Sequence, residues 1–142
     1  MSDQPDGLFS VEDQIVLLTG GSRGIGAAIA KGFAARGARV IICGREMETL
    51  QNAAAGMPGK HPVRPWQCDI ANPKEIQEMV AGTENEVGPI DTLVNVAGVN
   101  RRKPALEMSE EDFDFILDIN LKGAFVVSQA VGKGMVERGK GC

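Results

Sequence analysis

Tyrosine is missing from this chain of 142 residues, and histidine occurs once. The single histidine, His61, stands in a proline-flanked loop, where we expect a surface role rather than a catalytic one. Cysteine occurs three times, at Cys43, Cys68 and Cys142, which is an odd number without the close spacing of metal ligands. The sequence therefore predicts no metal site, buried thiols at Cys43 and Cys68, and a reducing, cytoplasmic setting.

Long apolar runs and an excess of positive charge are missing too. No apolar stretch approaches the roughly 18 residues that span a bilayer, and residues 1–7 are too polar and acidic for a signal peptide. The formal net charge is -4 and the pI is about 5.0, which argues against a basic surface for nucleic acid. We expect the partner to be a small molecule, with no nucleic acid and no membrane.

Short apolar runs alternate with helical patterns along the chain, which predicts a parallel sheet covered on both faces. Right-handed crossovers then predict the strand order 3-2-1-4, with the proline-containing third strand at an edge. The fold class is α/β, a doubly wound sheet of the Rossmann type, with a disordered tail over 1–8 and one domain over 9–142. The expected strands are 15–18, 40–43, 63–68 and 90–96, and the expected helices are 25–36, 46–55, 73–86 and 110–136, the last bent near 120–123.

Capping signals mark the starts of two of these helices. Asn72 and Pro73 suit a cap and a first helical residue, and Glu75 suits the reciprocal arm of a capping box. Ser109 precedes three acidic residues, which is a second helix-start signature. In the first helix, an apolar stripe that includes Ile25 and Ala28 is expected to face the core.

A glycine-rich turn connects the first strand to the first helix. Gly20, Gly24 and Gly26 have the spacing G-x-x-x-G-x-G, which lets the backbone approach a phosphate closely. Backbone amides at the helix start near Ile25 face such an anion, and Ser22 adds a hydroxyl donor. Because the turn lies between a strand and a helix, it predicts a site for a dinucleotide pyrophosphate.

The end of the second strand distinguishes between the two nicotinamide dinucleotides. NAD sites usually carry an acidic residue there, whereas this chain has Gly44 followed by Arg45. Arg45 suits the 2'-phosphate of NADP, and Arg23 in the glycine turn adds a second charge. NADP is therefore favoured over NAD. Glu46 argues for NAD, and a plain surface charge at a helix start is the alternative interpretation of Arg45.

Four motifs in order resemble the short-chain dehydrogenase/reductase family, and the resemblance covers the chain from about residue 8. They are T-G-G-S-R-G-I-G at 19–26, an acid at Asp69, N-V-A-G at 95–98 and an asparagine at Asn120. The resemblance implies that Asp69 and the backbone of Ile70 hold the adenine amine. It also implies that Asn95 braces the strand ends, that ribose lies against Ala97 and Gly98, and that Asn120 is a catalytic-site residue holding a relay water.

The chain departs from the family pattern at two places. Val96 replaces the second asparagine of N-N-A-G, and the catalytic serine and Y-x-x-x-K pair are not present. We expect a cofactor-binding half, truncated after the fourth strand and the following helix, whose intact parent is an oxidoreductase acting on a carbonyl or secondary alcohol. A short protein that pairs with a partner along its fourth strand is the alternative, as is a non-catalytic nucleotide-binding or scaffold module.

The segment 99–113 is similar to that of gluconate 5-dehydrogenase and 2-deoxygluconate dehydrogenase members of the family. Arg101, Arg102 and Lys103 are candidates for attracting a sugar-acid carboxylate, or the acidic carrier of a 3-oxoacyl carrier-protein reductase, and a solvated basic loop is the plainer interpretation. The last helix resembles the subunit-contact helix of the family, which implies a homo-oligomeric parent. Its candidate contact residues are Phe113, Ile116, Phe125, Val126 and Ala130.

Overall fold

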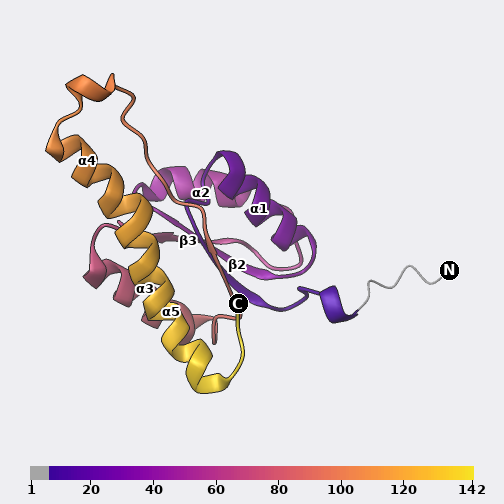
Figure 1. Cartoon of the computed structure of the whole chain (residues 1–142). Coiled ribbons are helices and arrows are strands. Elements are labelled where there is room, and N and C mark those ends of the chain that lie inside the picture. The colour runs from indigo at the N-terminus through magenta and orange to yellow at the C-terminus, as the bar shows by residue number, and fades with distance from the viewer. Residues whose placement is uncertain (1–6) are drawn as a thin grey trace.

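Four parallel strands form a single sheet in the order β3-β2-β1-β4 in the computed structural model, which describes residues 7–142 (Figure 1). In the register, Leu17 pairs with Ile41 on one side and with Leu93 on the other. The predicted fold class and strand order are confirmed, and Pro65 lies on an edge strand as expected. The strands are β1 (Ile15–Thr19), β2 (Arg39–Gly44), β3 (Arg64–Gln67) and β4 (Thr92–Asn95).

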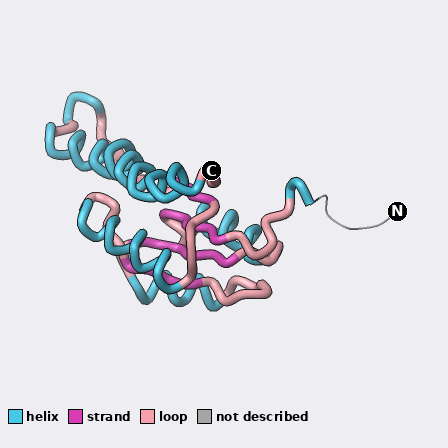
Figure 2. Tube along the Cα trace, turned by 90° about the horizontal axis from the view of Figure 1, so that it is seen from below, coloured by secondary structure: helices cyan, strands magenta, loops and turns pink. Residues whose placement is uncertain are grey.

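Helices cover both faces of this sheet, because alternate residues of each buried strand point to opposite sides (Figure 2). Leu17 and Ile41 belong to one core cluster with α3 and α5, whereas Leu18 and Ile42 belong to a second cluster with α1 and α2. The helices are α1 (Gly24–Ala35), α2 (Met47–Ala55), α3 (Pro73–Glu86), α4 (Glu110–Leu117) and α5 (Ala124–Arg138), with single turns η1 (Gly7–Phe9) and η2 (Ala105–Glu107). Of the tail expected over 1–8, residues 1–6 lie outside the described residues.

The final helix is one continuous run with a wider turn inside it. Between α4 and α5, the segment η3 (Asp118–Gly123) is π-helical, and it coincides with the bend expected near 120–123. The run Glu110–Arg138 is long and apolar enough to cross a membrane by length and composition alone. No apolar stretch of this length was predicted from the sequence, and Asp118, Lys122 and Lys133 are charged residues within this run. The core helix of a globular domain meets the same criterion, and here Val127 and Val131 pack into the core against the sheet and α3.

Two local predictions about helices need correction. The buried face of α1 is formed by Gly26, Ala30 and Ala34, while Ile25 is 73% exposed, because the helix approaches the sheet through its smallest side chains. Asn72 caps α3 as expected, but the Glu75 carboxylate does not return to the backbone of Asn72. It accepts hydrogen bonds from the Asp69 N–H and from the Asn72 side chain, both at 2.8 Å.

The outer edge of β4 is partly paired at its start. The N–H of Cys142 donates to the Asp91 carbonyl at 3.0 Å, and the N–H of Leu93 donates to the Cys142 carbonyl at 2.8 Å. The Asp91 carboxylate also accepts from the Ile15 N–H at 3.0 Å and pairs with Lys140. The outer edge of β4 therefore begins to pair with residue 142 of the chain itself.

The hydroxyl of Thr83 on α3 is buried and has no hydrogen-bond partner among residues 7–142. Because an unsatisfied buried hydroxyl opposes folding, we expect Thr83→Val to raise the free energy of unfolding by about 1 kcal/mol. Thr92 is the matched control, because its buried hydroxyl donates to Gln14 at 3.2 Å. Thr92→Val should lower stability by about 1 kcal/mol. Urea unfolding measures both, and a loss of stability in Thr83→Val would contradict the assignment.

Candidate dinucleotide site

A cavity of about 480 Å³ opens at the carboxyl ends of the four strands. Crevices at this edge of an open α/β sheet are the usual place for a bound nucleotide. All the residues predicted to bind the cofactor line it except Asn95, and the structure adds five that sequence reasoning missed. The lining comprises Gly20, Ser22, Arg23, Gly24, Ile25, Gly26, Gly44, Arg45, Asp69, Ile70, Ala97 and Gly98 from the prediction, together with Cys43, Cys68, Val96, Val99 and Ile119.

The glycine turn is shaped by a close backbone approach and by a positive φ angle. A Cβ atom on Gly26 would stand 2.1 Å from the carbonyl oxygen of Gly20, so the start of α1 lies directly against the end of β1. Gly24 has a φ of +55°, which disfavours other residues, and open space surrounds the position of its missing side chain. The turn thus presents bare backbone to the cavity.

The first turn of α1 is open to a ligand. Its N-cap residue is Arg23, whose side chain makes no capping hydrogen bond. The amide groups at the start of a helix have no partner inside the helix and attract anions. This donor set fits a pyrophosphate, because an anion placed here satisfies backbone groups that the described part of the chain leaves free.

A small hollow of about 110 Å³ adjoins the cavity, between the glycine turn and the start of α2. Arg23 and Arg45 both line it, and neither forms an ion pair within residues 7–142. The carboxylate of Glu46, which also lines the hollow, accepts a hydrogen bond from the Thr49 hydroxyl at 3.1 Å. The hollow thus has two guanidinium groups without an ion-pair partner among the described residues, and one carboxylate that is hydrogen-bonded to a hydroxyl. This arrangement favours the binding of a dianionic group.

Asp69 is fixed by its neighbours in the turn after β3. Its N–H donates to Glu75 at 2.8 Å, and its Oδ1 atom accepts from the Ala71 N–H at 3.0 Å. The next residue, Ile70, is buried and lines the cavity beside it. This leaves the Oδ2 atom of Asp69 without an intramolecular partner among the described residues, at the place where the adenine-contacting acid was expected.

Asn95 braces the fold outside the cavity. Its side-chain amide donates to the Ser128 hydroxyl on α5 at 2.9 Å, and that hydroxyl donates to the Ala124 carbonyl. The bracing role expected for Asn95 agrees with these bonds. Asn95 was also predicted to bind the cofactor, but its side chain is directed toward α5 rather than into the cavity.

Thr19 is the first residue of the T-G-G-S-R-G-I-G motif, but no role of its own was predicted for it from the sequence. Its side chain is buried, and its Oγ1 atom accepts hydrogen bonds from the N–H groups of Val96 and Ala97 at 3.1 and 3.2 Å. These bonds join the end of β1 to the turn after β4, which forms one wall of the cavity. A hydroxyl residue at the last position of an otherwise apolar strand is the signal that identifies it.

Asn120 lies in the π-helical segment and pairs with the backbone of Val99. Its Nδ2 atom donates to the Val99 carbonyl at 2.9 Å, and its Oδ1 atom accepts from the Val99 N–H at 2.7 Å. Asn120 was expected to bind backbone of its own helix, and it binds the backbone of the turn after β4 instead. Each end of the amide makes one of these bonds, so the side chain holds Val99 in the cavity wall. The relay water expected at Asn120 remains a prediction, because an amide retains a second N–H and a second lone pair.

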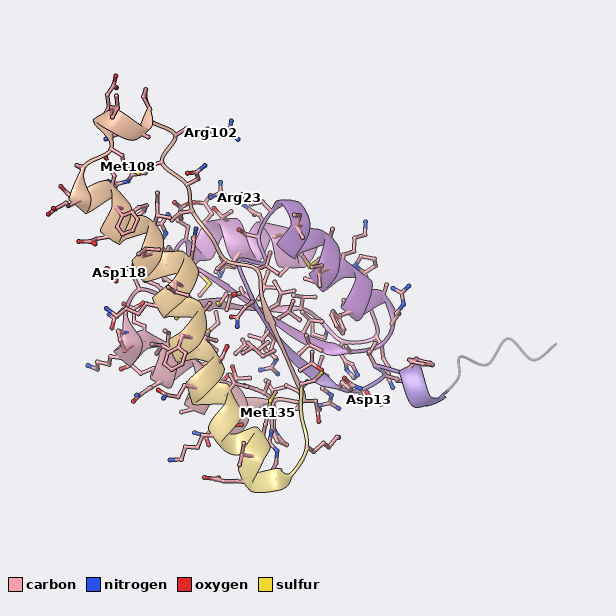
Figure 3. All side chains as sticks on the ribbon, in the orientation of Figure 1. Asp13, Arg23, Arg102, Met108, Asp118 and Met135 are labelled. Carbon is pink, nitrogen blue, oxygen red and sulfur yellow. The ribbon has the colours of Figure 1, made fainter. Side chains whose placement is uncertain are left out.

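The three basic residues after β4 do not act together. Arg101 and Lys103 both pair with the carboxylate of Asp112, and Arg101 lies over the ring of Phe115 at 4.0 Å. Arg101 and Lys103 are thus already engaged by one internal carboxylate, which offsets one of their two positive charges. Attraction of a substrate carboxylate by the three residues remains a prediction. Arg102 remains exposed at the same end of the molecule as Arg23 (Figure 3).

The two cysteine side chains that line the cavity, Cys43 and Cys68, are uncharged. Burial raises the pKa of Cys43 and of Cys68 to about 12, so both thiols stay protonated. The prediction of buried thiols is confirmed. Across residues 7–142 no cluster of three potential metal ligands occurs. His61 pairs with Asp13 at 2.7 Å at the opposite end of the molecule, away from the cavity.

The sheet order and the position of the cavity define a Rossmann-like α/β domain with its site at the carboxyl edge of the sheet. Residues 14–142 match the family model described as short chain dehydrogenase. The chain therefore belongs to the short-chain dehydrogenase family, whose members use NAD(P) cofactors.

Named relatives and a solved structure agree with this family. Gluconate 5-dehydrogenase of Gluconobacter oxydans is 40% identical over 138 residues, which are 96% of this chain and 54% of that enzyme. D-threitol dehydrogenase of Mycolicibacterium smegmatis is 42% identical over 134 residues, 94% of this chain and 52% of that enzyme. A short-chain dehydrogenase/reductase crystal structure from Mycobacterium marinum superposes with a TM-score of 0.86 at 35% identity, covering 93% of this chain and 54% of that one. The chain thus spans about half the length of the curated relatives it matches.

Proposed function

We propose that this chain binds NADP(H), and that the whole protein is an oxidoreductase that interconverts a secondary alcohol and a carbonyl compound. The observation that carries the first part is the hollow at the end of β2, where Arg23 and Arg45 stand free beside the open start of α1. A 2'-phosphate in this hollow would meet two guanidinium groups. The bound nicotinamide supplies the hydride chemistry.

The remaining residues of the cavity hold the cofactor in one orientation. The amides at the start of α1 would bind the pyrophosphate, and the free Oδ2 atom of Asp69 would accept from the adenine amine. Ala97 and Gly98 offer a wall with little side chain, against which ribose fits. Asn120 acts on this wall indirectly, because its amide fixes the backbone of Val99.

A polyol or sugar acid is the substrate class that we propose. Two relatives with this chemistry in their names, a gluconate 5-dehydrogenase and a D-threitol dehydrogenase, support it. Arg102, which no carboxylate within the described chain neutralises, is the cation left to meet an acidic substrate. The proton donor and acceptor of the reaction are not assigned to any of these 142 residues, since the chain has no tyrosine.

We also propose that the whole protein is a cytoplasmic homo-oligomer. Large apolar side chains are exposed along the last helical run at Phe113, Leu117, Leu121 and Phe125. Exposed apolar rows of this kind mark protein contacts. This exposed row includes Phe113 and Phe125 of the predicted contact residues. The other three predicted residues, Ile116, Val126 and Ala130, are partly buried.

Equilibrium binding to the purified 142-residue chain tests the cofactor proposal. We expect NADPH to bind more tightly than NADH, and Arg45→Gln to weaken NADPH binding by roughly 10- to 100-fold, because a charge-assisted phosphate contact contributes about 1.5–3 kcal/mol. Binding of NADH should change less than about twofold, because NADH carries no 2'-phosphate.

Arg39 gives the matched control. It is an exposed arginine at the other end of the same strand, β2, so Arg39→Gln should leave both affinities unchanged. Tighter binding of NADH than of NADPH by the unsubstituted chain would refute the assignment of NADP. Failure to bind either dinucleotide would refute the site itself.

A further inference from the structure

The chain between β4 and α4 projects from the body of the domain. We call residues 99–108 the arm; Figure 1 shows it rising beyond the end of the sheet before it returns into α4. Most of its residues are exposed, and Leu106 at its tip is fully so. An arm with this exposure has little apolar burial to hold it in one place.

Two polar attachments join the arm to the rest of the described chain. At its base, the backbone of Val99 pairs with Asn120. Further out, Arg101 and Lys103 both bind one carboxylate, that of Asp112 on the first turn of α4. The arm's other hydrogen bonds, from Glu107 and Met108, stay inside the arm.

The Asp112 carboxylate is unusually enclosed for an acid on a projecting helix. Its side chain is 3% exposed, whereas those of Arg101 and Lys103 are 37% and 46% exposed. The Arg101 guanidinium approaches it to 2.7 Å and also covers the Phe115 ring, so it is held from two sides. The same carboxylate accepts from the Ser109 N–H and closes a capping box at the start of α4.

Because the two cations lie on the arm and the carboxylate lies on the helix, these bonds join the arm to α4 at a point remote from Val99. The Lys103 and Arg101 hydrogen bonds hold the pKa of Asp112 well below its usual range. The carboxylate therefore stays ionised throughout the neutral range, so a loss of its charge does not release the arm under those conditions. Because the carboxylate itself is buried, salt screens these pairs less than it screens a fully exposed pair.

We propose that Asp112 is a positioning residue that locks the arm to α4 through Arg101 and Lys103, so that the arm is a fixed wall beside the cavity and not a mobile flap. The link to a substrate rests on the proposed function, because Val99 at the arm's base lines the dinucleotide cavity. The lock itself depends only on the contacts of Asp112 with the arm.

Limited proteolysis reports the lock directly, because trypsin can cut the arm after Arg101 and after Arg102 but not after Lys103, which precedes proline. The two cleavage products differ in mass, so cleavage after Arg102 can be followed separately. The cleavage rate after Arg102 is measured on the folded chain and divided by the rate on the chain unfolded in urea. We expect Asp112→Asn to raise this ratio about tenfold or more, because it removes both ion pairs and retains the side-chain shape. Asp114→Asn, which removes an exposed acid from the same helix, should leave it unchanged.

Two further readouts separate a local lock from general loss of stability. Cleavage after Arg39, at the start of the buried strand β2, should not change in Asp112→Asn, and NADPH affinity should change less than about threefold. In a double-mutant cycle, Asp112→Asn should have a smaller effect when Arg101 is already glutamine.

Parallel acceleration after Arg39 and Arg102 would overturn the proposal, since Asp112 would then support only global folding. Equal rates for Asp112→Asn and Asp114→Asn would overturn it as well, as would additive effects of the Arg101 and Asp112 variants. Failure of the unsubstituted chain to bind NADPH would refute the proposed function and leave the proteolysis result unaffected.

Discussion

Replacing Gly26 with alanine should abolish dinucleotide binding and destabilise the chain by about 3 kcal/mol. The new Cβ atom would stand 2.1 Å from the Gly20 carbonyl oxygen and 2.9 Å from its carbon. Neither atom belongs to a flexible side chain, so the start of α1 must move away from the end of β1. That displacement removes the amides of α1 from the phosphate position, and NADPH affinity should fall by more than about 100-fold.

Gly32 provides a matched control in the same helix. A Cβ atom there meets only the Arg36 guanidinium, at an ordinary contact distance of 3.6 Å. Since alanine has the higher helix propensity, Gly32→Ala should stabilise the chain by about 0.5–1 kcal/mol and leave NADPH binding intact. Urea unfolding and isothermal titration distinguish the two variants. A Gly26→Ala chain that binds NADPH normally would show that the close approach is not required.

Replacing Thr19 with valine should cost about 2–4 kcal/mol of unfolding free energy, although valine has nearly the same shape. The change removes the only side-chain acceptor for the N–H groups of Val96 and Ala97 among the described residues. Each unsatisfied buried donor costs about 1–3 kcal/mol. Because the turn after β4 forms a wall of the cavity, NADPH affinity should fall as well.

Thr19→Ser tests whether the hydroxyl is responsible. Serine keeps the acceptor and loses one methyl group, so the expected loss is about 1 kcal/mol. Denaturant unfolding of both variants gives the comparison. Equal destabilisation by valine and serine would assign the effect to packing and contradict the hydrogen-bond account.

Most of the fold was predictable because its signals are local. Alternating apolar runs and helical patterns indicated the α/β class, and right-handed crossovers then predicted the strand order that the structure has. The glycine turn, with Arg45 and Asp69, also identified most of the cavity, because parallel strands carry the residues that follow them to one edge of the sheet. Residues adjacent to strand ends are therefore brought together by topology alone.

The errors concern side chains whose partners lie far away in the sequence. The sequence predicts unpaired positive charge at Arg101 and Lys103, because their spacing does not indicate that Asp112 contacts them in the folded chain. In the same way, the direction of Asn95 depends on Ser128, which lies 33 residues further along and is brought close only when α5 packs beside β4.

The class of the domain, the order of its strands and the glycine turn could thus be predicted from the amino-acid sequence, because each depends on short-range pattern and chain connectivity. Which charged side chains have an ion-pair partner among the described residues, and which do not, became known only from the tertiary structure. Charge pairing depends on distances of a few ångströms between segments that only packing brings together, and for this reason Arg101 and Lys103 share Asp112 while Arg23 and Arg45 have no such partner among residues 7–142.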